Sequence, residues 1–138
     1  MGSDEDSIRR MFNAYVEAFQ ALEPRSVAIY LDAPFMFIGP QGVRVLRDFA
    51  EIESFLAGIM AQLRAQDYAR STIADIRVNR MSASNALVSV RRARYRTDGS
   101  ELEKLGETYT LRKVEGNWRI VAAMVHDPGA IVALAPAQ

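Results

Sequence analysis

The single histidine, His126, is the side chain whose ordinary charge change falls nearest to neutral pH, and it stands at the end of the last strand-like segment. Two-residue alternation places it on the face of Met124 and, if the alternation is unbroken, on the face of Trp118 and Ile120 as well. If that face lines the interior of the fold, the imidazole could transfer protons at a pocket. The alternative is a solvent-facing or hydrogen-bonded histidine that begins the turn at Asp127.

Phenol groups form the second set of candidates. Four tyrosines could each orient a carbonyl or enolate oxygen: Tyr15, Tyr30, Tyr95 and Tyr109. Tyr15 and Tyr30 lie on the apolar faces of helical segments, and Tyr109 lies on a strand. We name Tyr15, Tyr30 and Tyr109 as candidate ligand-binding residues. For any single tyrosine the alternative is core packing, with the hydroxyl reaching a polar partner at the surface.

Arginines form the one cluster of charge, over residues 91–96. Alternation places Arg92, Arg94 and Arg96 on the face of the preceding valines. An arginine inside a pocket would recognise a carboxylate, and Arg94 is our candidate. On the outer face the arginines would instead pair across strands with Glu103 or Glu107, or with a partner subunit.

Composition excludes several classes of function. The 17 basic and 17 acidic residues balance, so no net charge draws the chain to nucleic acid or to an anionic membrane. With no cysteine and one histidine, disulfides, thiolate sites and metal sites built on two histidines are excluded within one chain. No apolar run approaches the roughly 18 residues that span a bilayer. The acidic, polar N-terminus has no signal-sequence pattern, which favours a cytoplasmic protein.

The elements that must position these residues follow from periodicity. A helical spacing of apolar residues covers 5–22, a short helix begins at Pro24, and a second long helix is capped by Asp48 with Glu51 in capping-box register. Alternation and turn residues predict a hairpin and a series of longer strands, over 33–38, 43–46, 73–80, 86–97, 105–114 and 118–126. Residues 128–138 form a C-terminal tail.

Two long amphipathic helices and a sheet of consecutive strands predict one α+β domain over residues 1–138. A long antiparallel sheet twists and curls, and helices laid on its concave face cannot fill the mouth of the resulting cone. We therefore expect a small-molecule pocket between the helices and the sheet.

Three features accompany this order of elements: an aromatic pair in the first helix, the segment Phe35-Met36-Phe37, and the segment Trp118-Arg119-Ile120 after the Gly116-Asn117 turn. Together they resemble the nuclear transport factor 2-like superfamily, which includes SnoaL-like cyclases and ketosteroid isomerases. The resemblance extends from the first helix to about Asp127. It implies a cystatin-like cone, a homodimer formed through the outer face of the sheet, and acid–base chemistry on small hydrophobic molecules without a metal or organic cofactor. Other members of the superfamily are binding modules.

The resemblance also brings Asp32 into consideration, because several superfamily enzymes use an acidic residue in this part of the cone for proton transfer. Asp32 and His126 would then form an acid–base pair in a lyase, isomerase or hydrolase. The alternatives are a water-facing aspartate and a non-catalytic ligand-binding or dimerisation module. The two functions differ in geometry, since catalysis requires both side chains to point into one cavity.

Overall fold

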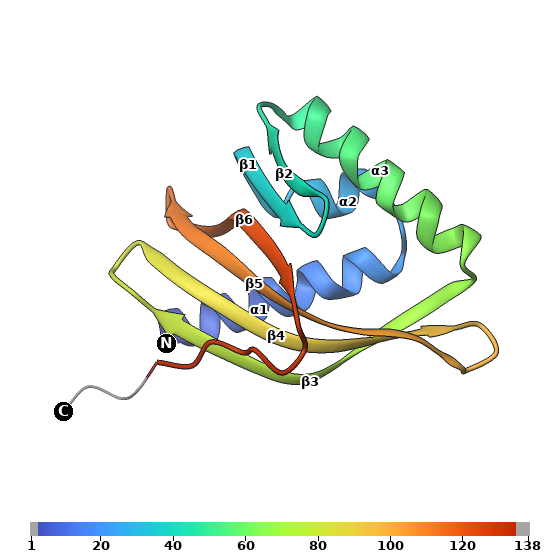
Figure 1. Cartoon of the computed structure of the whole chain (residues 1–138). Helices are drawn as coiled ribbons and strands as arrows, with labels where there is room; N and C mark the ends of the chain where they lie inside the picture. The colour runs from blue at the N-terminus through green and yellow to red at the C-terminus, as the bar shows by residue number, and fades with distance from the viewer. Residues whose placement is uncertain (1–2, 135–138) are drawn as a thin grey trace.

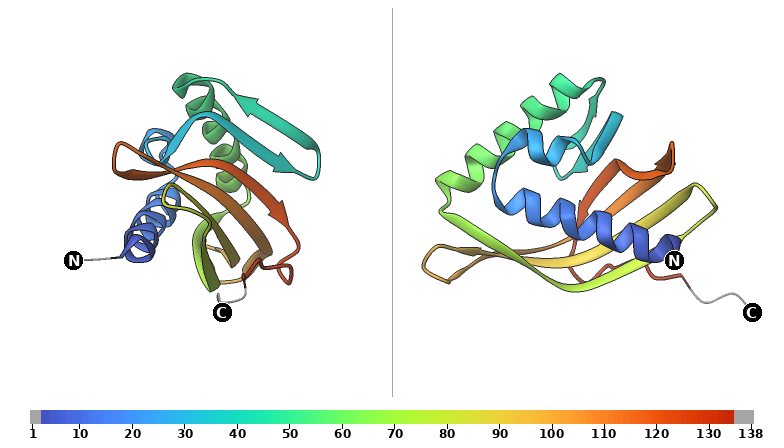
Figure 2. Two further views of the ribbon diagram at one scale, coloured as in Figure 1. Left: turned by 90° about the vertical axis from the view of Figure 1, so that its left-hand side faces the viewer. Right: turned by 180° about the vertical axis from the view of Figure 1, so that it is seen from behind.

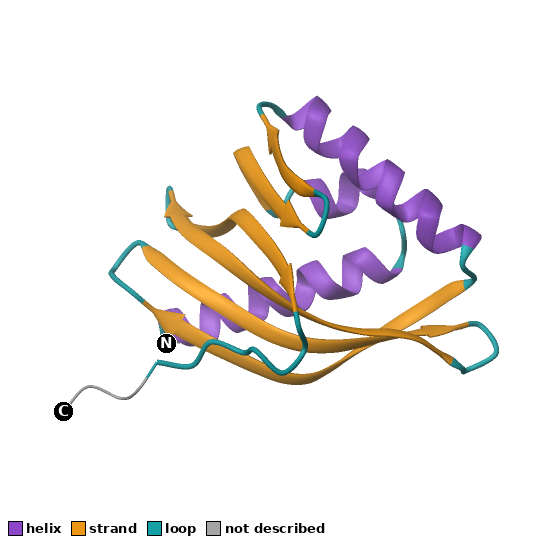
Figure 3. Cartoon of the chain, in the orientation of Figure 1, coloured by secondary structure: helices purple, strands orange, loops and turns teal. Residues whose placement is uncertain are grey.

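The computed structural model describes residues 3–134, which form three helices and a sheet of six strands (Figure 1, Figure 3). The helices are α1 (Asp4–Gln20), α2 (Pro24–Ala28) and α3 (Phe49–Ala65). The strands are β1 (Leu31–Gly39), β2 (Gly42–Leu46), β3 (Tyr68–Arg80), β4 (Asn85–Arg96), β5 (Glu101–Val114) and β6 (Asn117–His126). The predicted α+β class and order of elements are confirmed, and the strands begin up to five residues earlier than the alternation indicates.

Local signals explain where the helices begin. Ser3 caps α1 by accepting a hydrogen bond from the backbone of Asp6, whose side chain bonds back to Ser3. Asp48 caps α3 by accepting from the backbone of Glu51. The Glu51 carboxylate accepts from the backbone of Arg47 rather than from that of Asp48, so the predicted capping box is only half formed.

The sheet has the order β2-β1-β6-β5-β4-β3. All neighbouring strands are antiparallel except β1 and β6, which run parallel. The hairpin β1–β2 therefore extends the sheet beyond the last strand of the chain. Bulges interrupt the register in several places, and the one in β6 decides the position of His126. It falls at Val121, because Ile120 pairs with Leu111 whereas Ala122 pairs with Thr110.

The helices lie against the concave face of the curved sheet, and α1 crosses the long strands (Figure 2). The core between them is formed by α1 with Ile8, Phe12 and Phe19, and by alternate residues of the strands such as Val88 and Leu111. After β6 the chain turns back along the opposite, convex face. Among the described residues, no helix is both long and apolar enough to cross a bilayer.

Candidate functional site

A cavity of about 980 Å³ opens between α1, α3, the hairpin β1–β2 and the concave face of β4–β6. We call it the cone cavity. Its walls are mostly apolar, with aromatic rings from α1, β1 and α3, namely Phe19, Phe35, Phe37 and Phe55. The Phe37 and Phe55 rings pack against each other with 5.1 Å between their centroids. Such walls suit the hydrophobic part of a small molecule.

Two buried charges, Arg92 on β4 and Glu107 on β5, face the cone cavity. Their side chains are only 2% and 8% exposed, and 2.8 Å separates Arg92 Nε from Glu107 Oε1. Arg92 also donates a hydrogen bond of 2.8 Å from Nη2 to the hydroxyl of Tyr109. Burial lowers the pKa of Arg92, but the Glu107 carboxylate and neighbouring phenols raise that pKa to a net value above the usual range, so the guanidinium stays charged.

The ion pair leaves hydrogen-bonding capacity unused. Although Arg92 Nε and Glu107 Oε1 are close, the N–H direction misses the oxygen, and neither atom has a hydrogen-bond partner. Arg94 Nε is buried without a partner as well. Buried polar atoms almost always have partners, so the two donors and one acceptor at this cavity require one, such as a bound water, an ion or a ligand.

Two tyrosines lie near the polar end of the cavity. Tyr15 lines it, and its ring lies edge-on to that of Tyr109 with 5.7 Å between their centroids. Tyr109 is not among the lining residues and is connected to the cavity through its hydrogen bond with Arg92. Burial and the negative charge of Glu107 raise the pKa of Tyr15 to about 12. Burial likewise raises the pKa of Tyr109 well above its ordinary value. Both phenols therefore keep their protons at physiological pH and can act as hydrogen-bond donors.

A second pair of charges lies further out on the same strands. Arg94 Nη1 is 2.9 Å from Glu103 Oε2, and its guanidinium lies over the ring of Phe19. The sequence did not decide which face of the sheet carries these arginines. The predicted cross-strand pairing with Glu103 and Glu107 is formed, but both pairs lie on the concave face rather than on the outer face.

His126 lies on the convex face, away from the cone cavity. Alternation along β6 is broken at Val121, so Ile120 faces the core on one side of the bulge and Ala123 and Val125 face the cavity on the other. The prediction that His126 shares a face with Trp118 and Ile120 is therefore wrong. Its ring lies over Gly106, where an added Cβ would be 2.7 Å from the imidazole.

Both ring nitrogens of His126 are hydrogen-bonded. Nδ1 lies 2.8 Å from the carbonyl of Asp127, and Nε2 lies 2.7 Å from the hydroxyl of Thr108. Thr108 continues to Ser89, which accepts from the backbone of Val132 in the C-terminal segment. The expected alternative of a hydrogen-bonded histidine at the start of the turn describes this arrangement. The segment around Val132 packs on the chain's own convex face.

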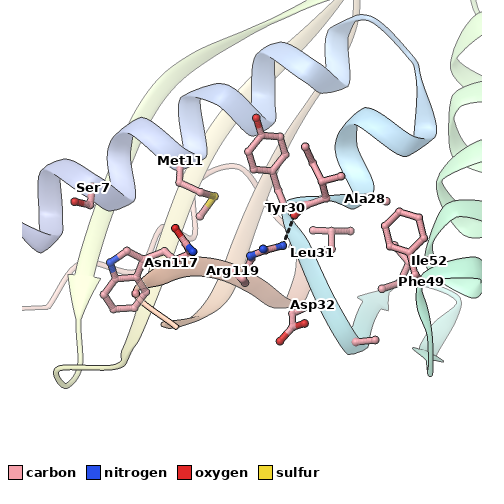
Figure 4. A pocket seen from close by; sticks show the side chains of 14 residues that line it. Ser7, Met11, Ala28, Tyr30, Leu31, Asp32, Phe49, Ile52, Asn117 and Arg119 are labelled. Atoms are coloured by element: carbon pink, nitrogen blue, oxygen red, sulfur yellow. Dashed lines mark hydrogen bonds between the residues drawn. The ribbon is translucent and has the colours of Figure 1, made fainter. Parts of the chain in front are cut away.

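Asp32 and Tyr30 line a different pocket of about 750 Å³, between the start of α1, the start of α3 and the start of β6 (Figure 4). In this pocket Arg119 donates a hydrogen bond to the carbonyl of Ile29. Leu31, next to Asp32, pairs with Ile120, six residues before His126, so roughly 20 Å of strand separates the two candidate catalytic residues. They do not share a cavity, and the acid–base pair is not formed.

Comparison with known proteins bears out the architecture. A family model described as "NTF2-like protein (DUF6841)" matches residues 4–128. The chain belongs to this family of NTF2-like proteins. A comparison with curated proteins gives no match.

Solved structures of NTF2-like proteins share the fold at low identity. An NTF2-like protein of unknown function from Shewanella oneidensis is 16% identical with a TM-score of 0.72, over 91% of this chain and 100% of its own. A ketosteroid isomerase-like protein from Erwinia carotovora is 16% identical with a TM-score of 0.67, over 91% and 96%. A domain of unknown function with a cystatin-like fold from Nostoc punctiforme is 17% identical with a TM-score of 0.70, over 91% and 77%. At such identities the likeness shows the fold alone.

In this NTF2-like chain the centre of the site, Arg92 with Glu107, was not among the sequence candidates, whereas the lining residues Tyr15 and Arg94 were. The candidate Tyr109 does not line the cavity and contacts Arg92 instead. One signal was available. Glu107 stands in the same alternation as Leu105 and Tyr109, and this pattern marks the buried face of β5. Between residues 3 and 134 no group of three or more histidine and acidic side chains is arranged to hold a metal ion.

Proposed function

We propose that this NTF2-like protein binds a small, mostly apolar molecule in the cone cavity, with the polar end of that molecule at Arg92 and Glu107. The observation that carries the proposal is the pair of buried, charged side chains with unused hydrogen-bonding atoms on the wall of an apolar cavity. An unpaired buried donor or acceptor costs about 1–3 kcal/mol, and a ligand that pairs with it recovers part of that cost.

Binding is the better supported of the two functions that the sequence left open. Asp32 lines the smaller pocket, whereas His126 lies on the convex face and lines neither of the two cavities, which removes the support for that pair as acid and base. Any proton transfer in the cone cavity falls in this proposal to Glu107 and Tyr15, the carboxylate and the protonated phenol that line it. The Arg92 guanidinium engages that carboxylate, and this favours binding over proton abstraction.

The test places a large side chain in the cavity and measures the effect on ligand binding. Ala123 lines the cone cavity, whereas its neighbour Ala122 belongs to the convex face, so Ala123→Phe and Ala122→Phe add the same ring on opposite sides of β6. The neutral fluorescent probe N-phenyl-1-naphthylamine should bind the wild type and Ala122→Phe saturably at one site, and Ala123→Phe at least about tenfold more weakly. Melting curves of both variants confirm that they are folded. Equal binding by both variants, or none by the wild type, refutes the proposal.

We also propose that the protein forms a homodimer through the convex face of the sheet. Four large apolar side chains are between 40% and 57% exposed there, and we call them the convex stripe: Met36, Val43, Val45 and Met124. They are continuous, because Met36 pairs with Val45 while Ile38 pairs with both Val43 and Met124. An exposed apolar patch on adjacent strands suits the same patch on a second copy related by a two-fold axis.

A further inference from the structure

The charges around the cone cavity balance. Its lining carries three arginines and three glutamates: Arg44, Arg92, Arg94, Glu51, Glu103 and Glu107. Arg92 is paired with Glu107 and Arg94 with Glu103, so both lining arginines of β4 already have their counter-charges. A ligand carboxylate placed beside Glu107 would add a negative charge where both neighbouring arginines are already paired, and an ammonium group would meet the opposite problem at Arg92.

Three buried polar atoms at the cone cavity have no hydrogen-bond partner. Arg92 Nε and Arg94 Nε are donors, and Glu107 Oε1 is an acceptor. Since 2.8 Å separates Arg92 Nε from Glu107 Oε1, one small polar group can accept from the first and donate to the second. A carboxylate offers acceptors alone and an ammonium group offers donors alone, so each would leave one side of this pair unsatisfied.

We propose that the ligand of the cone cavity is a neutral molecule whose polar end both accepts and donates a hydrogen bond, such as a primary amide or an alcohol. Its acceptor pairs with Arg92 Nε, its donor pairs with Glu107 Oε1, and its apolar part lies against the phenylalanine rings. This inference rests on the proposed function, because it names the class of molecule that the same cavity takes.

The experiment compares three naphthalenes of similar size that differ at one end, by competition against N-phenyl-1-naphthylamine at pH 7.5. They are 1-naphthaleneacetamide, 1-naphthaleneacetate and 1-methylnaphthalene. We expect the amide to bind at least about tenfold more tightly than the acetate. The acetate cannot donate a hydrogen bond to Glu107 Oε1, and its negative charge is repelled by the Glu107 carboxylate. Acetate that binds as tightly as the amide overturns the inference.

The methyl compound separates this inference from the proposed function. If it displaces the probe while the amide has no advantage over the acetate, the cavity binds apolar molecules and only the inference on their polar end is wrong. If none of the three compounds displaces the probe, the proposed function fails and the inference fails with it.

Two variants that each remove one negative charge test whether the preference for the amide depends on Glu107. Glu107→Gln leaves Arg92 without its counter-charge, so the ratio of amide to acetate affinity should fall at least about tenfold from its wild-type value. Glu53→Gln removes the same charge from the ion pair with Arg25, which lies outside the lining of the cone cavity, and its ratio should stay within about threefold of the wild type. Equal shifts in both variants contradict a role for the Arg92–Glu107 pair. If Glu107→Gln does not fold, the wild-type series alone decides the question.

Discussion

Arg92 and Glu107 form a diagonal pair on neighbouring strands, since Arg92 stands opposite Leu105 and Glu107 opposite Val90. Both side chains leave the sheet on its concave face, where the core would otherwise be apolar. A buried ion pair rarely adds stability over apolar residues of the same size, because removing both charges from water is costly. Its presence at the wall of the cone cavity is therefore better explained by what the cavity binds than by folding.

Breaking this pair should be far more damaging than replacing it. Arg92→Ala leaves Glu107 buried without a counter-charge, and we expect a loss of about 3–5 kcal/mol in the free energy of unfolding. The double variant Arg92→Met with Glu107→Leu should recover most of that loss. Urea denaturation followed by circular dichroism measures both. A double variant no more stable than Arg92→Ala would show that the pair itself holds the fold together.

Stability at high pH should depend on Tyr15. Its pKa in the folded protein is about 12, against an ordinary value of 10.0, so the folded state holds this proton more tightly than the unfolded chain. The corresponding stabilisation is complete below pH 10 and is lost as the pH rises towards 12. The free energy of unfolding should therefore fall over this interval in the wild type, and fall less steeply in Tyr15→Phe.

Urea denaturation at intervals between pH 8.5 and 11.5 gives both slopes. Tyr30→Phe controls for the loss of a phenol from a half-buried ring near Tyr15, since the two ring centroids are 6.5 Å apart. A Tyr15→Phe slope equal to that of the wild type would mean that this phenol does not stabilise the fold in the way its burial implies.

Local signals explain why most of the fold could be predicted. The caps at Ser3 and Asp48, the turn over residues 39–42 and the period-2 alternation of the long strands each involve residues close in sequence. The parallel pairing of β1 with β6 was not predicted, because it joins segments about 85 residues apart. The residue pattern of a strand does not indicate which other strand it pairs with.

The bulge at Val121 was missed for a different reason. Residues 120–125 are all apolar, so no polar side chain marks the point at which the alternation changes phase. The error put His126 on the face of Trp118 and Ile120, and its proposed acid–base role depended on that placement. By contrast, the alternation correctly placed Arg92 on the face of Val88 and Val90 and named Glu107 as a possible partner, and only the side of the sheet that this face occupies was left open.

The proposed dimer should depend on the convex stripe. Met124→Lys places a charge at its centre, since Met124 and Val43 both pair with Ile38, and should convert the dimer to a monomer with the mass of one chain, 15.4 kDa. Light scattering coupled to gel filtration at micromolar concentration measures the mass. Met81→Lys, on a methionine after β3 that is 54% exposed against 41% for Met124, is the matched control and should remain dimeric. A wild type with the mass of one chain refutes the dimer itself.

Gly106 should tolerate no larger residue, because the backbone of β5 passes directly under the end of β6. A Cβ at this position would lie 2.6 Å from the carbonyl oxygen of Asp127 and 2.7 Å from the His126 ring. The ring could rotate away at the loss of its bond to Thr108, but the carbonyl belongs to the backbone, so Gly106→Ala should lower the free energy of unfolding by about 1–3 kcal/mol.

Gly58→Ala is the control: its Cβ would meet nothing within 4 Å on helix α3, and it should raise stability by about 0.5–1 kcal/mol. Adding His126→Ala to Gly106→Ala should restore only part of the loss, since the clash with Asp127 remains. Full recovery in that double variant, measured by urea denaturation, would place the whole conflict at the imidazole.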